Sequence, residues 1–451
     1  MSSANGRWSS WGAFNLAAVG AAVGLGSIWR FPYLAGTYGG STFLLVFILA
    51  CLAIATPLLV AEFVIGRRSR QSPPEAAGHV AAAFGYSRSW NWIGVLGTIA
   101  CVLIISNYTV VAGWVIAYAW KCASGQIMGL SRAAVADHFA GFLASPWQVG
   151  LWHIVFLGIV GWVSARGLSR GIEIANKVRA PGLLILLLVL VGYALAIGDP
   201  HGLAFAFRPD LSKLSADLVL AAIGQAFYAT GVGMAIMLAY GAYVPNNVSL
   251  VRSALLISTA IVVVSVLATA MVFPLVFQYG LNPAQGPDLV FNVLPTAFVE
   301  MPAGRWVGTL FFILLVLAAL TPTIGGLEPM VAWFQQRRGL SRPTAVFFTV
   351  AIVWGLGLGS VLSFNVWKDW HPLAWTAYLQ NKTVFDVIDF VSSNILLPVG
   401  ALLSCVFVGW RLPFSLIQEQ SADTAAVQTC CRLLLKFVCP FAIATVLIAA
   451  L

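Results

Sequence analysis

The chain of 451 residues is 60% hydrophobic and 9% charged, and its mean hydropathy is +0.91. Soluble domains carry about 25% charged residues, so this composition excludes a soluble globular protein and predicts an all-α integral membrane protein. The net charge of +9 does not indicate nucleic-acid binding, because the basic residues lie in short loops between apolar segments. The expected surroundings are the lipid bilayer, and the sequence gives no indication of an oligomeric state.

A membrane-spanning helix needs about 20 apolar residues. We expect eleven spans, at 10–36, 40–66, 90–120, 148–166, 174–197, 217–242, 250–279, 304–335, 342–362, 383–410 and 431–450. Two thirds of the 24 Lys and Arg residues then lie on the side of the amino terminus. The positive-inside rule therefore predicts a multi-pass protein of the cell inner (plasma) membrane, with a cytoplasmic N-terminus and an outer C-terminus. The outer stretch 283–303 is too short to span and is expected to form a re-entrant or lid-like hairpin.

The first apolar segment contains Gly20, Gly24 and Gly26 within seven residues, and Arg30 follows at its outer end. Each glycine weakens a helix by roughly 1 kcal/mol relative to alanine, and small residues allow the backbone to unwind towards a ligand. The alternative is a glycine-rich face that packs against a neighbouring helix. An arginine at this depth needs a partner.

A matching interruption occurs five spans later, where Gly231 and Gly233 lie inside the sixth apolar segment. Broken spans at corresponding positions of two five-span halves are typical of inverted-repeat transporters. We therefore predict a single transporter domain, made of two inverted five-span repeats and one additional span. These parts cover 8–197, 217–410 and 431–450 of the range 1–451.

Several motifs resemble the neurotransmitter:sodium symporter family over about residues 8–450. The most specific is the run from Gly20 to Pro32. The others are Trp8, Gly39-Gly40, Pro57 with Glu62, Tyr108 with Gly113-Trp114, Gly224-Gln225-Ala226-Phe227, Leu320-Thr321, and Asp386 with Asp389. Eleven spans resemble the bacterial amino-acid transporters of this family. The resemblance implies the leucine-transporter fold and sodium-driven uptake of amino acids or related amines.

The resemblance also implies a substrate site between the two interruptions. Its residues are Ala22, Leu25, Gly26, Ile104, Tyr108, Tyr228, Ala229, Gly231, Met234, Pro322, Gly325 and Gly326. Tyr108 is expected to offer its hydroxyl to the polar head of the substrate, and Tyr228 to act as an aromatic lid and gate. The glycines Gly231, Gly325 and Gly326 replace residues that are often larger in the family. We therefore expect a neutral, large or aromatic amino acid or a related zwitterion, unless these glycines serve helix packing.

The outer gate of the family matches this sequence, whereas the inner gate does not. Arg30 and Asp389 are expected to pair across the outer vestibule, because a lone aspartate in a span needs such a partner. The inner ion pair of the family falls on Asn5 and Gln336, which carry no charge. Tyr243 remains as the expected gate residue on the inner side.

The first sodium site of the family is expected to be lost. Its three side-chain ligands fall on Ser27, Ala229 and Ile261, and a hard cation requires oxygen ligands that alanine and isoleucine side chains do not have. No chloride site is expected either, because Phe47 and Ala229 replace hydroxyl ligands.

The second sodium site resembles that of the family more closely. Its expected ligands are the carbonyls of Gly20, Val23 and Ala318 and the hydroxyl of Thr321, while Pro322 replaces a serine. The sequence therefore predicts a single coupling ion, Na⁺, at this second position.

The leading hypothesis is a sodium symporter that works by alternating access. One alternative is a sodium-independent or proton-coupled carrier of the same fold, which would use Glu62 or Glu328. Another is a ligand sensor that does not transport, but an outer gate of Arg30 and Asp389 is useful mainly to a protein that cycles. An enzyme is not expected, because the five histidines are scattered and no cluster of nucleophile, base and orienting acid is present.

Overall fold

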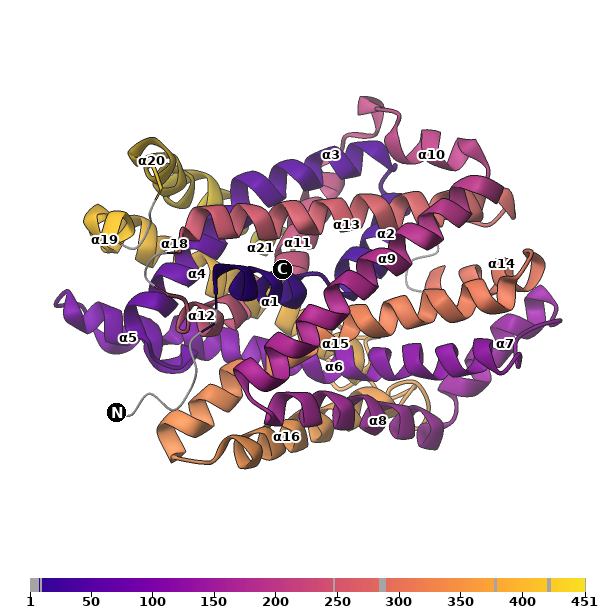
Figure 1. Cartoon of the computed structure of the whole chain (residues 1–451), viewed down its shortest axis with the longest axis horizontal. Helices are drawn as coiled ribbons and strands as arrows, with labels where there is room; N and C mark the ends of the chain where they lie inside the picture. The colour runs from indigo at the N-terminus through magenta and orange to yellow at the C-terminus, as the bar shows by residue number, and fades with distance from the viewer. Residues whose placement is uncertain are drawn as a thin grey trace.

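The computed structural model describes residues 8, 10–245, 248–283, 289–376, 379–419 and 423–450, which fold into helices and turns without a strand (Figure 1). The helices of the first half are α1 (Trp11–Ala22), η1 (Gly26–Arg30), α2 (Phe31–Thr37), α3 (Ser41–Ala50), η2 (Cys51–Ala55), α4 (Thr56–Ser69), α5 (Pro73–Ala83), η3 (Arg88–Asn91), α6 (Trp92–Ala123), α7 (Arg132–Leu143), α8 (Pro146–Ala165), η4 (Leu168–Glu173), α9 (Ile174–Ile197), α10 (Pro200–Phe207) and η5 (Leu211–Lys213). Those of the second half are α11 (Ala216–Thr230), α12 (Ile236–Gly241), α13 (Leu250–Gln278), η6 (Leu289–Val293), α14 (Leu294–Glu300), α15 (Gly304–Arg338), α16 (Arg342–Leu362), α17 (Val384–Phe390), η7 (Val391–Leu396), α18 (Leu397–Val406), η8 (Phe407–Arg411), α19 (Phe414–Glu419), α20 (Ala425–Leu433), η9 (Leu434–Val438) and α21 (Cys439–Ala450).

Within the described residues, nine helices are long and apolar enough to cross a membrane, and a bent pair at the amino terminus makes a possible tenth. The predicted segment 217–242 is not among them, because it is divided between α11 and α12. The prediction of an all-helical membrane architecture is confirmed. The count of eleven spans, the inverted repeat and the orientation stay predictions.

The first interruption lies between α1 and η1. Helix α1 ends at Ala22, and the following helical stretch, Gly26–Thr37, is inclined to it by 51°. Val23 has an extended backbone, with φ −79° and ψ 100°, so the helical hydrogen-bond pattern stops there. The last carbonyl groups of α1 and the first N–H groups of the next stretch are therefore left for other partners.

The second interruption lies between α11 and α12. Gly231 and Gly233 have φ values of +66° and +83°, which glycine adopts readily because it has no Cβ. Ala235 is also left-handed, with φ +58°. The buried carboxylate of Glu62, on α4, accepts a hydrogen bond of 2.7 Å from the Gly233 N–H. This contact gives Glu62 a structural role at the second interruption.

Helices α6 and α15 run side by side through the molecule (Figure 1). Two prolines, Pro322 and Pro329, lie inside α15. A proline has no N–H, so the carbonyls of Ala318 and Gly325, four residues earlier, lack their usual helical donor. The middle of α15 therefore exposes unpaired carbonyl oxygen close to the first interruption.

Within the outer stretch 283–303, residues 289–300 are helical, as η6 and α14. Residues 284–288 of the predicted hairpin lie outside the described residues. Phe291 of η6 makes edge-to-face contacts with Trp114 and Tyr118 of α6, with ring centroids 5.7 and 5.4 Å apart. This stretch therefore packs against one end of α6.

Candidate functional site

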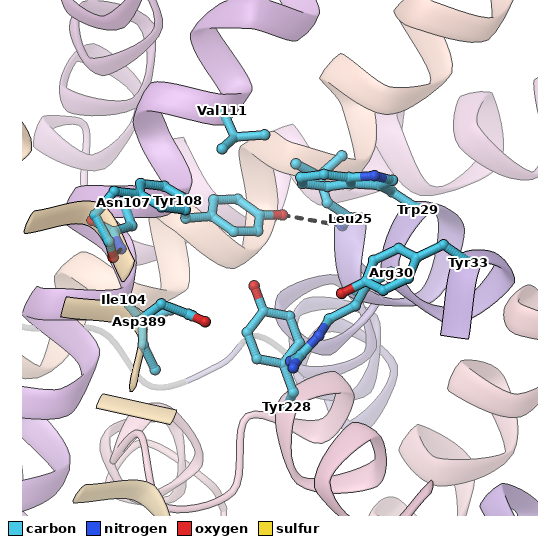
Figure 2. Close-up of a pocket in the computed structure, with 12 residues that line it drawn as sticks. Leu25, Trp29, Arg30, Tyr33, Ile104, Asn107, Tyr108, Val111, Tyr228 and Asp389 are labelled. Atoms are coloured by element: carbon cyan, nitrogen blue, oxygen red, sulfur yellow. Dashed lines mark hydrogen bonds between the residues drawn. The ribbon is translucent and has the colours of Figure 1, made fainter. Parts of the chain in front are cut away.

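A cavity of about 140 Å³ lies beside the first interruption, between η1, α6 and α11 (Figure 2). A smaller cavity of about 40 Å³ lies next to it, towards α15. Ten of the twelve predicted substrate residues line one or both. The first cavity includes Leu25, Gly26, Ile104, Tyr108 and Tyr228. The smaller one adds Ala22, Ala229, Gly231, Met234 and Pro322.

The remaining two, Gly325 and Gly326, line neither cavity. A Cβ added to Gly326 would lie 2.6 Å from Ile105 of α6, and one added to Gly325 would lie 3.1 Å from both Ala21 and Tyr240. These glycines allow neighbouring helices to approach closely, as in many membrane proteins. These contacts favour the packing alternative for the two glycines, and their place in the substrate site stays a prediction.

Two polar side chains hold the unwound segment in place. The hydroxyl of buried Tyr108 accepts a hydrogen bond of 3.1 Å from the Leu25 N–H, drawn as a dashed line in Figure 2. Gln225 of α11 donates from Nε2 to the Gly26 carbonyl at 2.7 Å. In the sequence, Gln225 is noted only as part of a motif. An amide within an otherwise apolar segment already indicates that a polar partner must be present, and the structure shows that partner to be Gly26.

Asn107 also lines the larger cavity, but both ends of its amide are engaged. Its Nδ2 donates to the Phe385 carbonyl at 2.9 Å, and its Oδ1 accepts a hydrogen bond from the Ser360 hydroxyl. Asn107 thus connects α6 to α16 and α17. The Tyr108 hydroxyl accepts from the Leu25 N–H and so keeps its own hydrogen to donate to a ligand.

The two residues of the predicted outer gate contact other groups in this structure. The Arg30 guanidinium lies over the Tyr228 ring, 4.2 Å from its centroid. The exposed Asp389 carboxylate accepts a hydrogen bond of 3.2 Å from the Ser393 hydroxyl. Arg30 and Asp389 approach Tyr228 from different sides (Figure 2), and the ion pairs within 4.0 Å among the described residues do not include them. The expected pair is therefore not formed in this conformation.

The residues at the first ion site do not fit a sodium ion. Ala229 and Ile261 are buried and carry only hydrocarbon side chains. Ser27 is also buried, and within the described chain its hydroxyl has no hydrogen-bond partner. One side-chain oxygen does not replace the three that the resemblance implies.

The residues at the second ion site are Gly20, Val23, Ala318 and Thr321, all buried. Here the structure adds a residue that sequence reasoning missed. Arg179 of α9 donates from Nη2 to the Gly20 carbonyl at 3.4 Å. Arg179 lies inside the predicted span 174–197, where a basic residue requires compensating groups, and that position was the available signal.

The inner end of the molecule holds a buried ion pair that was also missed. Arg342 of α16 donates to both carboxylate oxygens of Glu328 on α15, at 2.9 and 2.8 Å, and Glu328 is fully buried. Tyr243 and Gln336 line a separate cavity at this end. Asn5, the other position of the inner gate, lies outside the described residues.

Comparison with known proteins gives consistent results. The model of the Sodium:neurotransmitter symporter family matches residues 5–129 and 138–451. The sodium-dependent transporter YhdH of Bacillus subtilis is 35% identical over 97% of this chain and 96% of its own. A sodium-dependent transporter of Haemophilus influenzae is 32% identical over 92% and 91%. The crystal structure of MhsT in complex with L-phenylalanine superposes with a TM-score of 0.90 at 36% identity, covering 99% of this chain and all of that one.

Proposed function

Because the chain belongs to the sodium:neurotransmitter symporter family, we propose that it is a secondary transporter of a large or aromatic neutral amino acid or a related zwitterion. The observation that carries this proposal is the cavity at the first interruption, where unwound backbone, Tyr108 and Tyr228 meet (Figure 2). Backbone at membrane depth is tolerated without helical hydrogen bonds only where it lines a protein cavity. The interruption thus fits a site that recognises a small polar ligand.

The charged groups of an amino acid match the helix ends around the cavity. The stretch Gly26–Thr37 begins there, and its N-terminal amides favour a carboxylate, to which Tyr108 can donate. Helices α1 and α11 end there, and their carbonyl ends favour an ammonium group. Among the described residues no carboxylate lines the smaller cavity, where Gly24 takes the place of an acid found in monoamine carriers, and the Asp389 carboxylate of the larger cavity is accompanied there by the Arg30 guanidinium. This arrangement favours a zwitterion over a cationic amine.

The apolar part of the wall supports a large hydrophobic side chain. Ile104, Ile105, Met234 and Ile236 surround the smaller cavity, and methionine adapts readily to different ligand shapes. The L-phenylalanine named for the MhsT complex is a ligand of this chemical class, and that protein shares the fold and 36% of the sequence. The proposed substrate class therefore rests on the apolar lining of the smaller cavity and on the similarity to MhsT.

Transport is proposed to follow from alternating access. At the outer end, Arg30 and Asp389 would pair over Tyr228 when the cavity closes, since both groups stand beside that ring. At the inner end, Tyr243 and the ion pair between Glu328 and Arg342 take the place of the missing gate residues. The sodium symporter and the sodium-independent or proton-coupled carrier differ in the ion that drives transport. The contact of Arg179 with Gly20 favours the alternative in which the second site does not require sodium.

Uptake of radiolabelled L-phenylalanine into proteoliposomes tests the proposed function. We expect saturable uptake that excess L-leucine and L-tryptophan compete and that L-glutamate and L-lysine do not. Phenethylamine lacks the carboxylate and 3-phenylpropionate lacks the ammonium group, so neither should compete. Liposomes without protein give the background. Absence of uptake and of competition for every neutral amino acid, in sodium and in choline, would refute the proposal.

A further inference from the structure

Arg179 is a positive charge buried beside the central cavity. It lies in the inner part of α9, and 7% of its surface is exposed. None of the ion pairs formed by the described residues includes it. An unpaired charge at this depth is costly, so other groups must compensate for it.

The compensating groups are carbonyl oxygens of α1 and α15. The guanidinium donates from Nη1 to the Leu317 carbonyl at 2.7 Å and from Nη2 to the Gly20 carbonyl at 3.4 Å. Gly20 belongs to the last turn of α1, whose carbonyls lack helical donors. Leu317 precedes Ala318, whose donor is removed by Pro322. The guanidinium therefore joins the carboxyl end of α1 to the middle of α15.

This position borders the predicted second sodium site. A Cβ built on Gly20 would lie 2.9 Å from Arg179 Nη2 and 3.0 Å from Thr321 Cγ2, so the guanidinium lies beside two predicted ligands. The same Cβ would lie 2.2 Å from Asn176 Oδ1. That oxygen is buried and has no hydrogen-bond partner within the described residues. The guanidinium therefore contacts one predicted ligand of the second sodium site, the Gly20 carbonyl, and lies close to the unpaired Asn176 oxygen.

We propose that the Arg179 guanidinium takes the place of the sodium ion in the second site, acting as a cation built into the chain. The inference rests on the proposed carrier function, because it assigns the ion requirement of that same site. A sodium ion and a guanidinium among the same carbonyls would repel each other at short range in a medium of low dielectric constant. Binding at the central cavity is then independent of sodium at this site. Removal of the guanidinium creates a site that sodium can fill.

The test measures sodium binding without any amino acid. Thermal unfolding of the purified protein is followed in sodium chloride and in choline chloride at equal ionic strength. An ion that binds only the folded state raises the unfolding midpoint. We expect the wild-type protein to have the same midpoint in both salts. For Arg179→Met, which replaces the guanidinium by an uncharged, unbranched side chain, we expect a midpoint that rises with sodium concentration. Adding Thr321→Ala to Arg179→Met should remove this response.

The outcomes separate cleanly. A sodium response in the wild type equal to that of Arg179→Met would overturn the inference, and so would a response that survives Thr321→Ala. If Arg179→Met does not fold, Arg179→Gln and Arg179→Lys replace it. A response in the glutamine variant alone supports the inference, and a response in both or in neither overturns it. Because no amino acid is present, failure here leaves the proposed substrate untouched, and failure of phenylalanine uptake leaves this test valid.

Discussion

Replacement of Tyr108 by phenylalanine isolates the contribution of one hydroxyl to the proposed site. In the structure this hydroxyl accepts from the Leu25 N–H at 3.1 Å, and the residue is 9% exposed. Tyr108→Phe leaves that buried N–H unsatisfied, which costs roughly 1–3 kcal/mol of stability. It also removes a donor to the substrate carboxylate. A hydrogen bond to a charged group contributes roughly 1.5–3 kcal/mol, so affinity should fall roughly 10- to 150-fold.

Helix α6 offers a matched control for this substitution. Tyr118 is 1% exposed, and its hydroxyl has no hydrogen-bond partner within the described residues. Tyr118→Phe should therefore leave both stability and affinity near the wild-type values. The assay is the shift of the unfolding midpoint on titration with L-phenylalanine. Equal effects of the two substitutions, or wild-type affinity in Tyr108→Phe, would refute the assigned role of the Tyr108 hydroxyl.

Three further predictions concern the cavity, the inner end and the outer gate. Gly24→Ala places a Cβ 2.6 Å from Pro322 and 2.9 Å from the Tyr108 hydroxyl, so it should abolish saturable phenylalanine binding in the same titration while the protein remains folded. Glu328→Gln removes the fully buried carboxylate that pairs with the partly buried Arg342 and should destabilise the protein by roughly 3–5 kcal/mol. Adding Arg342→Met should recover part of this loss, and additive losses in thermal unfolding would show that the pair is not coupled. Asp389→Asn removes the charge that the proposed outer closure requires and should slow uptake into proteoliposomes, whereas an unchanged rate would exclude the gate role.

The two interruptions illustrate what the sequence predicts well. Gly24 and Gly26 in the first segment, and Gly231 and Gly233 in the sixth, lie where the structure interrupts α1 and separates α11 from α12. Glycine lowers helix stability and admits positive φ, so these effects can be read from local sequence. The sequence does not distinguish an interruption from close packing, and Gly326 shows this limit because it contacts Ile105 instead of lining the cavity.

The residues that were missed depend on contacts between distant parts of the chain. Arg179 and Arg342 both lie near the ends of predicted spans, where a basic residue usually reaches the membrane surface. The structure instead turns Arg179 towards Gly20 and Arg342 towards Glu328. Which way a long side chain turns depends on the oxygen atoms that the fold brings near it. A partner for each buried charge has to be sought in three dimensions.

The most direct measurement compares stabilisation of the wild-type protein by a panel of amino acids in sodium chloride and in choline chloride. A ligand that binds only the folded state stabilises it by RT ln(1 + [L]/Kd) and thereby raises the unfolding midpoint. The account predicts that L-phenylalanine and other large neutral amino acids raise the midpoint equally in both salts, because Arg179 already supplies the cation at the second site. Stabilisation that appears only in sodium would contradict it.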